Sequence, residues 1–114
     1  TNEITRKRSD YLEGTYALHG IEEVMCEDDV IIFIEPWESE FEKIQSIFEK
    51  NIGATVIAIS SKETPFPTIK LPELCGFNTY FRLMAGWNLL VQTGIALGVD
   101  LDHPTRARKI GNAI

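Results

Sequence analysis

Histidine and carboxylate side chains are the groups in this sequence whose types and positions could carry acid–base chemistry. The chain has two histidines, His19 and His103. Histidine titrates near neutral pH, so it can give and take a proton under physiological conditions. His19 stands beside Gly20 in a turn expected before a buried strand, where an imidazole can be exposed at a sheet edge. The alternatives are a structural role for His19 and a solvated loop position for His103, between Asp102 and Pro104.

The remaining polar residues favour simpler interpretations. No second histidine or cysteine is spaced to complete a metal site, so no metal is expected. The acidic residues, with Glu3 among them, are typical of solvated surface when only residue type is considered. Ser60-Ser61-Lys62 follows an expected strand and could cradle a phosphate, but no helix clearly follows it, which favours a plain turn. Residue types alone therefore predict a parallel α/β fragment that could bind a small anion.

Length and composition indicate one small globular domain. The chain has 114 residues, 44% of them hydrophobic and 25% charged, which excludes a disordered chain or a fibre. It has 11 basic and 17 acidic residues, and the net charge of −6 argues against a free-standing nucleic-acid binder. No apolar run approaches the ~20 residues that span a bilayer. Cys26 and Cys75 are expected to be buried free thiols in a reducing cytoplasm.

The hydrophobic pattern predicts the elements that must position these groups. The continuous apolar run Val30–Ile34 is typical of a strand buried on both faces in a parallel sheet. An amphipathic helix and a second apolar run follow it, which together make a βαβ unit. We predict strands near residues 30–35, 54–60 and 68–71, helices near residues 38–50 and 77–98, and a tail over residues 99–114. The fold class is therefore α/β.

The chain also shows signs of being part of something larger. It begins at Thr1, and residues 1–12 are typical of the end of a helix, so we expect a fragment, a split chain or a processed product. Three strands are few for an α/β sheet, which usually has about five. We expect the missing strands to lie upstream of Thr1 or in another chain.

Two short segments at opposite ends of the chain resemble one protein family. Asn2-Glu3-Ile4-Thr5, with His19-Gly20 sixteen residues after the glutamate, resembles the Lys-Glu-Ile-Ser … His-Gly segment in the sugar isomerase (SIS) half of glucosamine-6-phosphate synthase. Asp100-Leu101-Asp102-His103-Pro104, with Lys109 five residues after the proline, resembles that family's C-terminal Asp-x-Asp-x-Pro-Arg-Asn-Leu-Ala-Lys. The resemblance covers essentially the whole chain. It implies the C-terminal portion of a second SIS domain, with an incomplete three-layer, parallel-sheet, flavodoxin-like fold.

The resemblance implies a role for individual residues. Glu3 would be the base that moves a proton between C1 and C2 of a sugar phosphate, and His19 would assist ring opening while reaching the neighbouring subunit's site. Lys109 would lie over the sugar on a tail that closes the pocket, with Arg106 as a second substrate contact. The residue types suit this chemistry, because an enediol path needs a carboxylate over both carbons and a proton carrier near neutral pH.

The family also implies partners and a location. The substrate would be a sugar phosphate, no metal or organic cofactor is expected, and neither nucleic acid nor membrane is a partner. We expect a cytoplasmic homodimer with a shared active site, and an N-terminal SIS domain in the same or a partner chain. In the family the phosphate-gripping Ser/Thr-rich loop lies in the first SIS domain, so the resemblance implies that this loop comes from that domain.

Departures from the family pattern leave the activity open. Ile21 stands where the family has proline, and Thr105-Arg106-Ala107-Arg108 replaces Arg-Asn-Leu-Ala. These differences suggest a relative of the synthase that is an aldose–ketose isomerase, a deglycase of glycated amines or an amino-sugar deaminase. A second hypothesis is a non-catalytic, sugar-phosphate-binding regulatory module. A third is a structural α/β fragment in which the matches arise by chance.

Overall fold

The structure is a computed structural model that describes residues 3–103, and these residues form two compact units. We call residues 11–85 the sheet unit, and residues 3–10 together with 86–103 the terminal unit. Helix α2 (Asn78–Ala96) begins in the sheet unit and ends in the terminal unit. Arg106 and Lys109 lie outside the described residues.

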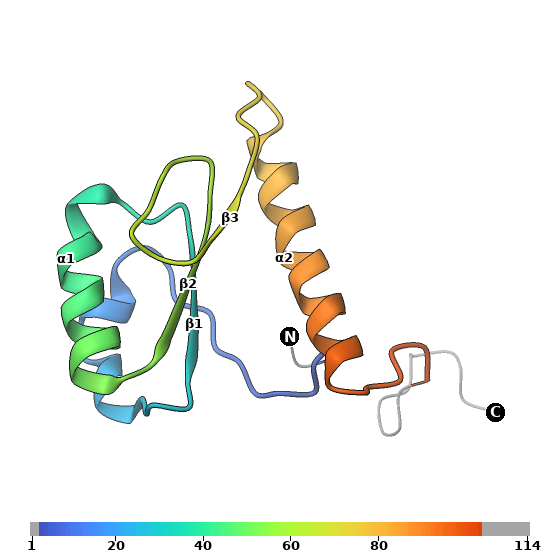
Figure 1. Ribbon diagram of the computed structural model, residues 1–114, viewed down its shortest axis with the longest axis horizontal. Coiled ribbons are helices and arrows are strands. Elements are labelled where there is room, and N and C mark those ends of the chain that lie inside the picture. The colour runs from blue at the N-terminus through green and yellow to red at the C-terminus, as the bar shows by residue number, and fades with distance from the viewer. Residues whose placement is uncertain (1–2, 104–114) are drawn as a thin grey trace. The chain divides into compact units, whose positions relative to one another are not determined.

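A parallel three-stranded sheet forms the centre of the sheet unit (Figure 1). Its strands β1 (Val30–Ile34), β2 (Thr55–Ser60) and β3 (Thr68–Lys70) lie in that order. The register pairs Val30 with Thr55 and Ser60 with Lys70. Because all three strands run in the same direction, their carboxyl ends meet at one edge of the sheet. The predicted α/β class with a parallel sheet is confirmed.

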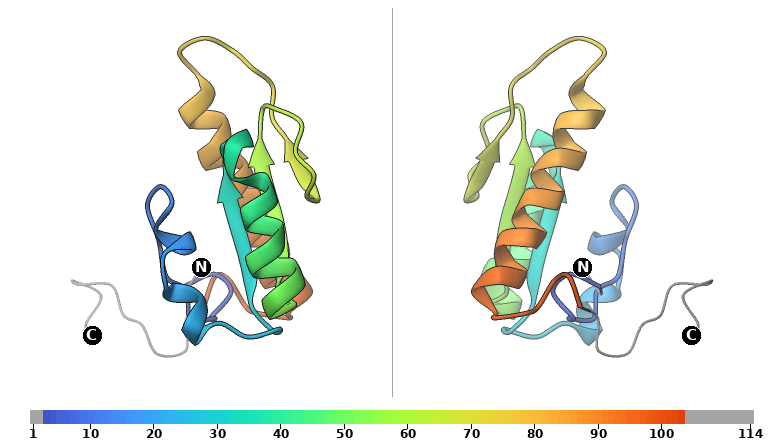
Figure 2. Two further views of the ribbon diagram at one scale, coloured as in Figure 1. Left: turned by 90° about the vertical axis from the view of Figure 1, so that its left-hand side faces the viewer. Right: turned by 90° about the vertical axis from the view of Figure 1, so that its right-hand side faces the viewer.

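One helical segment connects β1 to β2 and covers one face of the sheet (Figure 2). It begins with a 3-10 turn, η3 (Glu38–Glu40), continues as α1 (Phe41–Ile44) and widens to a π-helix, η4 (Gln45–Ile52). Gly53 ends it with φ of 80°, a left-handed conformation that glycine adopts without steric cost. The amphipathic helix predicted near residues 38–50 is therefore confirmed.

The hydrophobic core lies between this helix and the covered face of the sheet. Phe48 and Ala58 are fully buried, and the rings of Phe48 and Phe33 are 5.8 Å apart. Phe66, from the loop between β2 and β3, packs edge-on against Phe41 at 5.7 Å. Burying each such aromatic side chain contributes about 1.5–3 kcal/mol. This packing fixes the sheet, and with it the carboxyl ends of β1 and β2.

The prediction that strand 30–34 is buried on both faces is wrong. Ile31 and Phe33 pack against the core, but Val30, Ile32 and Ile34 on the other face are exposed, with Val30 58% exposed. A continuous apolar run normally indicates two covered faces, and here the described residues of the sheet unit cover one. The run is apolar enough to be covered on both faces, so the sheet unit leaves an unpartnered apolar surface.

The N-terminal residues also differ from their prediction. Residues 3–5 form a turn and residues 6–13 have no regular structure, so the helix expected over residues 1–12 is not present in the described part. Arg6 has φ of 54°, which an α-helix does not allow. Regular structure begins with two 3-10 turns, η1 (Tyr16–Leu18) and η2 (Ile21–Val24). Ala17 and Leu18 of η1 belong to the core.

The described helices include none that is long and apolar enough to cross a bilayer.

Candidate functional site

Glu3 lies in the turn at residues 3–5, in the terminal unit. Its side chain is exposed, whereas Thr5, two residues later, is 5% exposed. The turn lies against helix α2 at Gly94, which is buried. A Cβ atom on Gly94 would lie 2.9 Å from the Ile4 carbonyl oxygen, which is closer than real Cβ contacts. Glu3 is therefore an exposed carboxylate beside a backbone that is packed tightly against the helix.

The segment that follows α2 forms a second turn in the same unit, from Asp100 to His103. The Asp100 carboxylate accepts hydrogen bonds at 3.1 Å from the backbone N–H groups of Asp102 and His103. The same carboxylate lies 3.1 Å from Nδ1 of the His103 ring. Hydrogen bonds from the backbone and ring of His103 hold the pKa of the Asp100 carboxyl below its usual value. The Asp100 side chain therefore closes this turn on itself.

Arg6 joins the two turns directly. Its Nη2 donates a hydrogen bond of 2.7 Å to the carbonyl oxygen of Asp100 and one of 3.2 Å to that of His103. These partners lie 94 and 97 residues away in the sequence. Leu101 reaches the same place on the helix, since a Cβ on Gly94 would lie 2.8 Å from its Cδ2. The terminal unit thus joins the segment that carries Glu3 to the segment that leads to Lys109.

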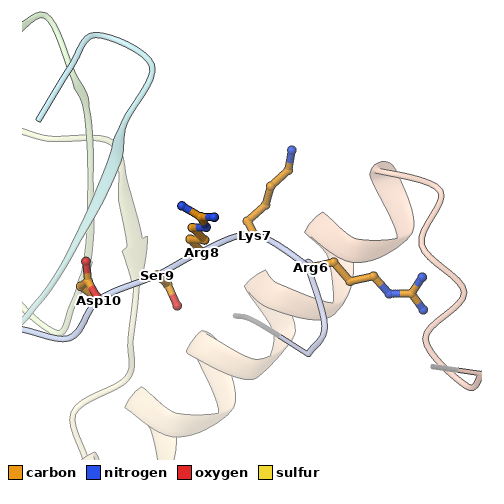
Figure 3. A pocket seen from close by; sticks show the side chains of 5 residues that line it. All are labelled: Arg6, Lys7, Arg8, Ser9 and Asp10. Carbon is orange, nitrogen blue, oxygen red and sulfur yellow. The ribbon is translucent and has the colours of Figure 1, made fainter. Parts of the chain in front are cut away.

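A shallow hollow of about 390 Å³ lies along the extended segment from Arg6 to Asp10. Figure 3 shows that Arg6 extends toward the loop after α2, whereas Lys7 and Arg8 point in other directions. An anion site needs donors that converge on one point. Because these three cations diverge, the hollow does not form a phosphate cradle.

His19 lies in the sheet unit, between the two 3-10 turns. Its ring Nε2 is 3.3 Å from the hydroxyl oxygen of Thr15, and the following Gly20 has φ of 102°. The ring is exposed and borders an open hollow of about 550 Å³, which is lined by Glu13, Gly14, Thr15, Tyr16, His19 and Trp37. His19 is thus accessible to a ligand or a partner chain, as its prediction requires.

Of the four predicted site residues, the structure describes Glu3 and His19, which belong to different units. Glu3 and the Asp100–His103 turn share the terminal unit, and His19 belongs to the sheet unit. Lys109 and Arg106 lie outside the described residues, so their predicted roles stay predictions. Cys26 and Cys75 are exposed, so the prediction that these thiols are buried is wrong. Within residues 3–103 no three metal-binding side chains come together.

Sequence reasoning missed a polar cluster at the carboxyl edge of the sheet. Glu35 follows β1 directly, with φ of 51°, and its carboxylate accepts hydrogen bonds from the hydroxyls of Ser60 and Ser61 and from the backbone N–H of Ser61. The guanidinium Nε of Arg82, from α2, lies 3.3 Å from the same carboxylate. A carboxylate and two serines that follow neighbouring parallel strands could have signalled this cluster, because ligands of α/β folds bind at that edge.

The environment of Glu35 keeps its carboxyl ionised. Burial raises the pKa of Glu35, but the hydrogen bonds from Ser61 and Ser60 and the charge of Arg82 outweigh this effect and lower the pKa overall. Ser60 is 1% exposed, and its hydroxyl donates to the Glu35 carboxylate while it accepts the backbone N–H of Lys62 at 3.0 Å. The donors around this carboxylate are those that would otherwise hold an anion, and Glu35 already occupies them.

We expect the Glu35 cluster to make the sheet unit less stable in acid. A carboxyl whose pKa is lowered by folding stabilises the fold above its unfolded pKa, and this contribution is lost as the pH falls through the folded value. Glu35→Gln removes that contribution, so the stability of the variant should fall less steeply between neutral pH and the acidic range. Glu38→Gln is the matched control, because Glu38 is exposed. Urea unfolding from pH 7 to pH 3 measures the difference, and identical pH profiles for Glu35→Gln and wild type would contradict it.

Neither the protein-family models nor the curated proteins include a significant match to this chain. The resemblance to SIS enzymes therefore rests on the two end motifs and on the order of the elements between them.

Proposed function

We propose that this chain is the C-terminal portion of a second SIS domain, in an enzyme that processes a hexose 6-phosphate. The reaction would be an aldose–ketose isomerisation, or the removal of an amine from an amino sugar or a glycated amine. Each of these reactions begins with proton transfer between C1 and C2 of the open-chain sugar. The complete domain would have the three-layer, flavodoxin-like architecture and act in the cytoplasm.

One observation carries this proposal. The two segments that resemble the SIS family lie at opposite ends of the sequence, yet Arg6 bonds directly to the backbone of Asp100 and His103. Both segments also pack on Gly94 of α2. Glu3 and the segment that leads to Lys109 thus share one unit, as the proposed site requires. An active site needs such convergence, because catalysis requires its groups to be held in a fixed geometry.

The exposed residues support the roles that we propose. Glu3 is an exposed carboxylate on a turn that packs on α2 at Gly94, which suits a base that must reach both C1 and C2 of a substrate. His19 is exposed beside a hollow, which suits a residue that opens the sugar ring in a neighbouring subunit's site. Lys109 and Arg106 would contact the oxygens of the substrate, with no metal or organic cofactor involved.

The apolar surface of the sheet supports the proposed partners. Val30, Ile32 and Ile34 line an exposed face of β1, and β1 pairs with a single described strand, β2. An exposed apolar strand at a sheet edge favours pairing with a further strand. We propose that the remainder of the SIS domain covers this face, and that a first SIS domain and a second subunit complete the active site.

Assays of the full natural protein with fructose 6-phosphate, glucosamine 6-phosphate and a glycated amine 6-phosphate test the function. Turnover of one of them, with ketose, aldose or free amine as product, is the expected result. Binding measured by calorimetry without any turnover would instead support the regulatory module. Neither binding nor turnover with any of the three would contradict both proposals and favour a chance resemblance.

A further inference from the structure

Arg6 adopts a backbone conformation that needs an explanation. Its φ of 54° lies in the left-handed region, which costs a residue with a Cβ atom on the order of 1–2 kcal/mol. Such a conformation persists where the surroundings hold it in place. Here the side chain makes two hydrogen bonds to backbone carbonyls on the far side of the terminal unit. The left-handed backbone of Arg6 thus coincides with a long-range contact of its side chain.

The two carbonyls that Arg6 binds lie at the two ends of one turn. Asp100 opens the turn and His103 ends it, and one nitrogen, Nη2, bonds to both. The interior of the turn is closed by the Asp100 carboxylate, which accepts the N–H groups of Asp102 and His103. Arg6 thus binds a turn that already has its own internal bonds. Arg6 adds the position of that turn relative to the segment of residues 3–5, and because it bonds to the carbonyls at both ends of the turn, it also limits the opening of the internal bonds.

The neighbouring cations do not share this contact. Figure 3 shows that Lys7 and Arg8 point away from the loop that Arg6 reaches. Both side chains are exposed, and no hydrogen bond or ion pair of the Arg8 side chain is present among the described residues. Positive charge alone therefore does not explain why Arg6 makes this contact. The position of its side chain and its planar guanidinium explain it, because a guanidinium can bond to two acceptors at once.

We propose that Arg6 is a positioning residue that fixes the Asp100–His103 turn beside the turn that carries Glu3. The chain that leaves this turn reaches Lys109 six residues after His103. Arg6, which lies three residues after the proposed base Glu3, therefore fixes the position of His103, from which the tail continues. Arg6 acts on the substrate through that tail and need not touch the substrate itself. The kinetic part of this inference rests on the proposed function, whereas the structural part does not.

Hydrogen exchange tests the structural part on the full natural protein. Arg6→Ala should speed the exchange of the Asp102 and His103 amides by about tenfold or more, because the turn loses its anchor. The Val99 amide, which bonds to the carbonyl of Gly94, should exchange at the wild-type rate. Arg8→Ala, which removes the same charge from a side chain without that contact, should change none of these rates. Unchanged exchange at Asp102 and His103 in Arg6→Ala would overturn the proposal.

A double-mutant cycle with Lys109→Ala tests the kinetic part. If Arg6 acts through the tail, Arg6→Ala and Lys109→Ala should each lower kcat/KM by about tenfold or more. The double variant should then be no worse than Lys109→Ala alone. Arg6→Lys should restore part of the loss, since its ammonium keeps the charge and a hydrogen-bond donor on one nitrogen. Fully multiplying effects would overturn the positioning role, because general destabilisation acts independently of Lys109.

Failure of this inference and failure of the proposed function give different results. A wild-type protein that turns over none of the sugar phosphates contradicts the proposed function, while the exchange rates still decide whether Arg6 anchors the turn. An active wild type in which Arg6→Ala exchanges at wild-type rates and keeps full activity contradicts the inference alone.

Discussion

Replacing Glu3 by glutamine is expected to lower kcat for the hexose 6-phosphate substrate by about 100- to 10,000-fold, the usual contribution of a positioned general base. Glutamine keeps the size and polarity of the side chain but cannot accept a proton at neutral pH. Because Glu3 is exposed, the change should alter the free energy of unfolding by less than about 0.5 kcal/mol. KM should stay within a few-fold of the wild-type value, because the other contacts with the substrate remain.

Glu73→Gln is the matched control for this variant. Glu73 is an exposed glutamate in the segment before α2, and the substitution makes the same chemical change outside the proposed site. Steady-state kinetics of both variants, with urea unfolding to verify their stability, provide the comparison. Full activity of Glu3→Gln would mean that Glu3 is not the base and that the resemblance of residues 2–5 to the SIS motif carries no function.

Replacing Gly94 by alanine is expected to destabilise the terminal unit by about 1–3 kcal/mol, the usual cost of overpacking. The added Cβ would lie 2.8 Å from the Cδ2 of Leu101 and 2.9 Å from the carbonyl oxygen of Ile4. The end of the Leu101 side chain can move aside at little cost, but the Ile4 carbonyl belongs to the backbone beside Glu3. The displacement should therefore reduce activity as well as stability, because it moves the proposed base.

Gly86→Ala, on the same helix, is expected to change stability in the opposite direction. No atom lies within 4 Å of a Cβ built on Gly86. Alanine is a better helix former than glycine by up to about 1 kcal/mol, so this variant should be more stable than wild type and equally active. Chemical unfolding of the two variants gives the difference directly. Equal stability of Gly94→Ala and Gly86→Ala would show that residues 3–5 and 100–103 do not pack on α2 as described.

The elements of the sheet unit could be predicted from the sequence because their signals are local. Apolar runs indicated the strands, and the helical spacing of Phe41, Ile44 and Phe48 indicated the helix between the first two. Whether the second face of Val30–Ile34 is covered could not be predicted in this way. An apolar run shows that both faces of a strand are suited to burial. Whether the second face is buried depends on segments outside the run.

The site was predicted less completely, because its geometry depends on contacts between distant residues. The resemblance to the SIS family marked Glu3, but nothing in the sequence indicated that Arg6 would leave the helical conformation expected there and bond across 94 residues to Asp100. The sequence analysis gave Glu35 no role, for the opposite reason. Its signal was present, as a glutamate after one strand and Ser60-Ser61 after the next, but the two had to be considered together as one sheet edge.

Deuterium incorporation into the substrate tests whether this protein transfers a proton between C1 and C2. The full natural protein is incubated in D₂O with fructose 6-phosphate and with an amino or glycated-amine hexose 6-phosphate, and the hydrogens at C1 of the ketose and at C2 of the aldose are followed by NMR. Proton transfer between C1 and C2 through a carboxylate predicts deuterium at these carbons in the wild type and none in Glu3→Gln. A wild-type protein that binds the sugar phosphates, incorporates no deuterium at either carbon and forms no product would contradict this mechanism.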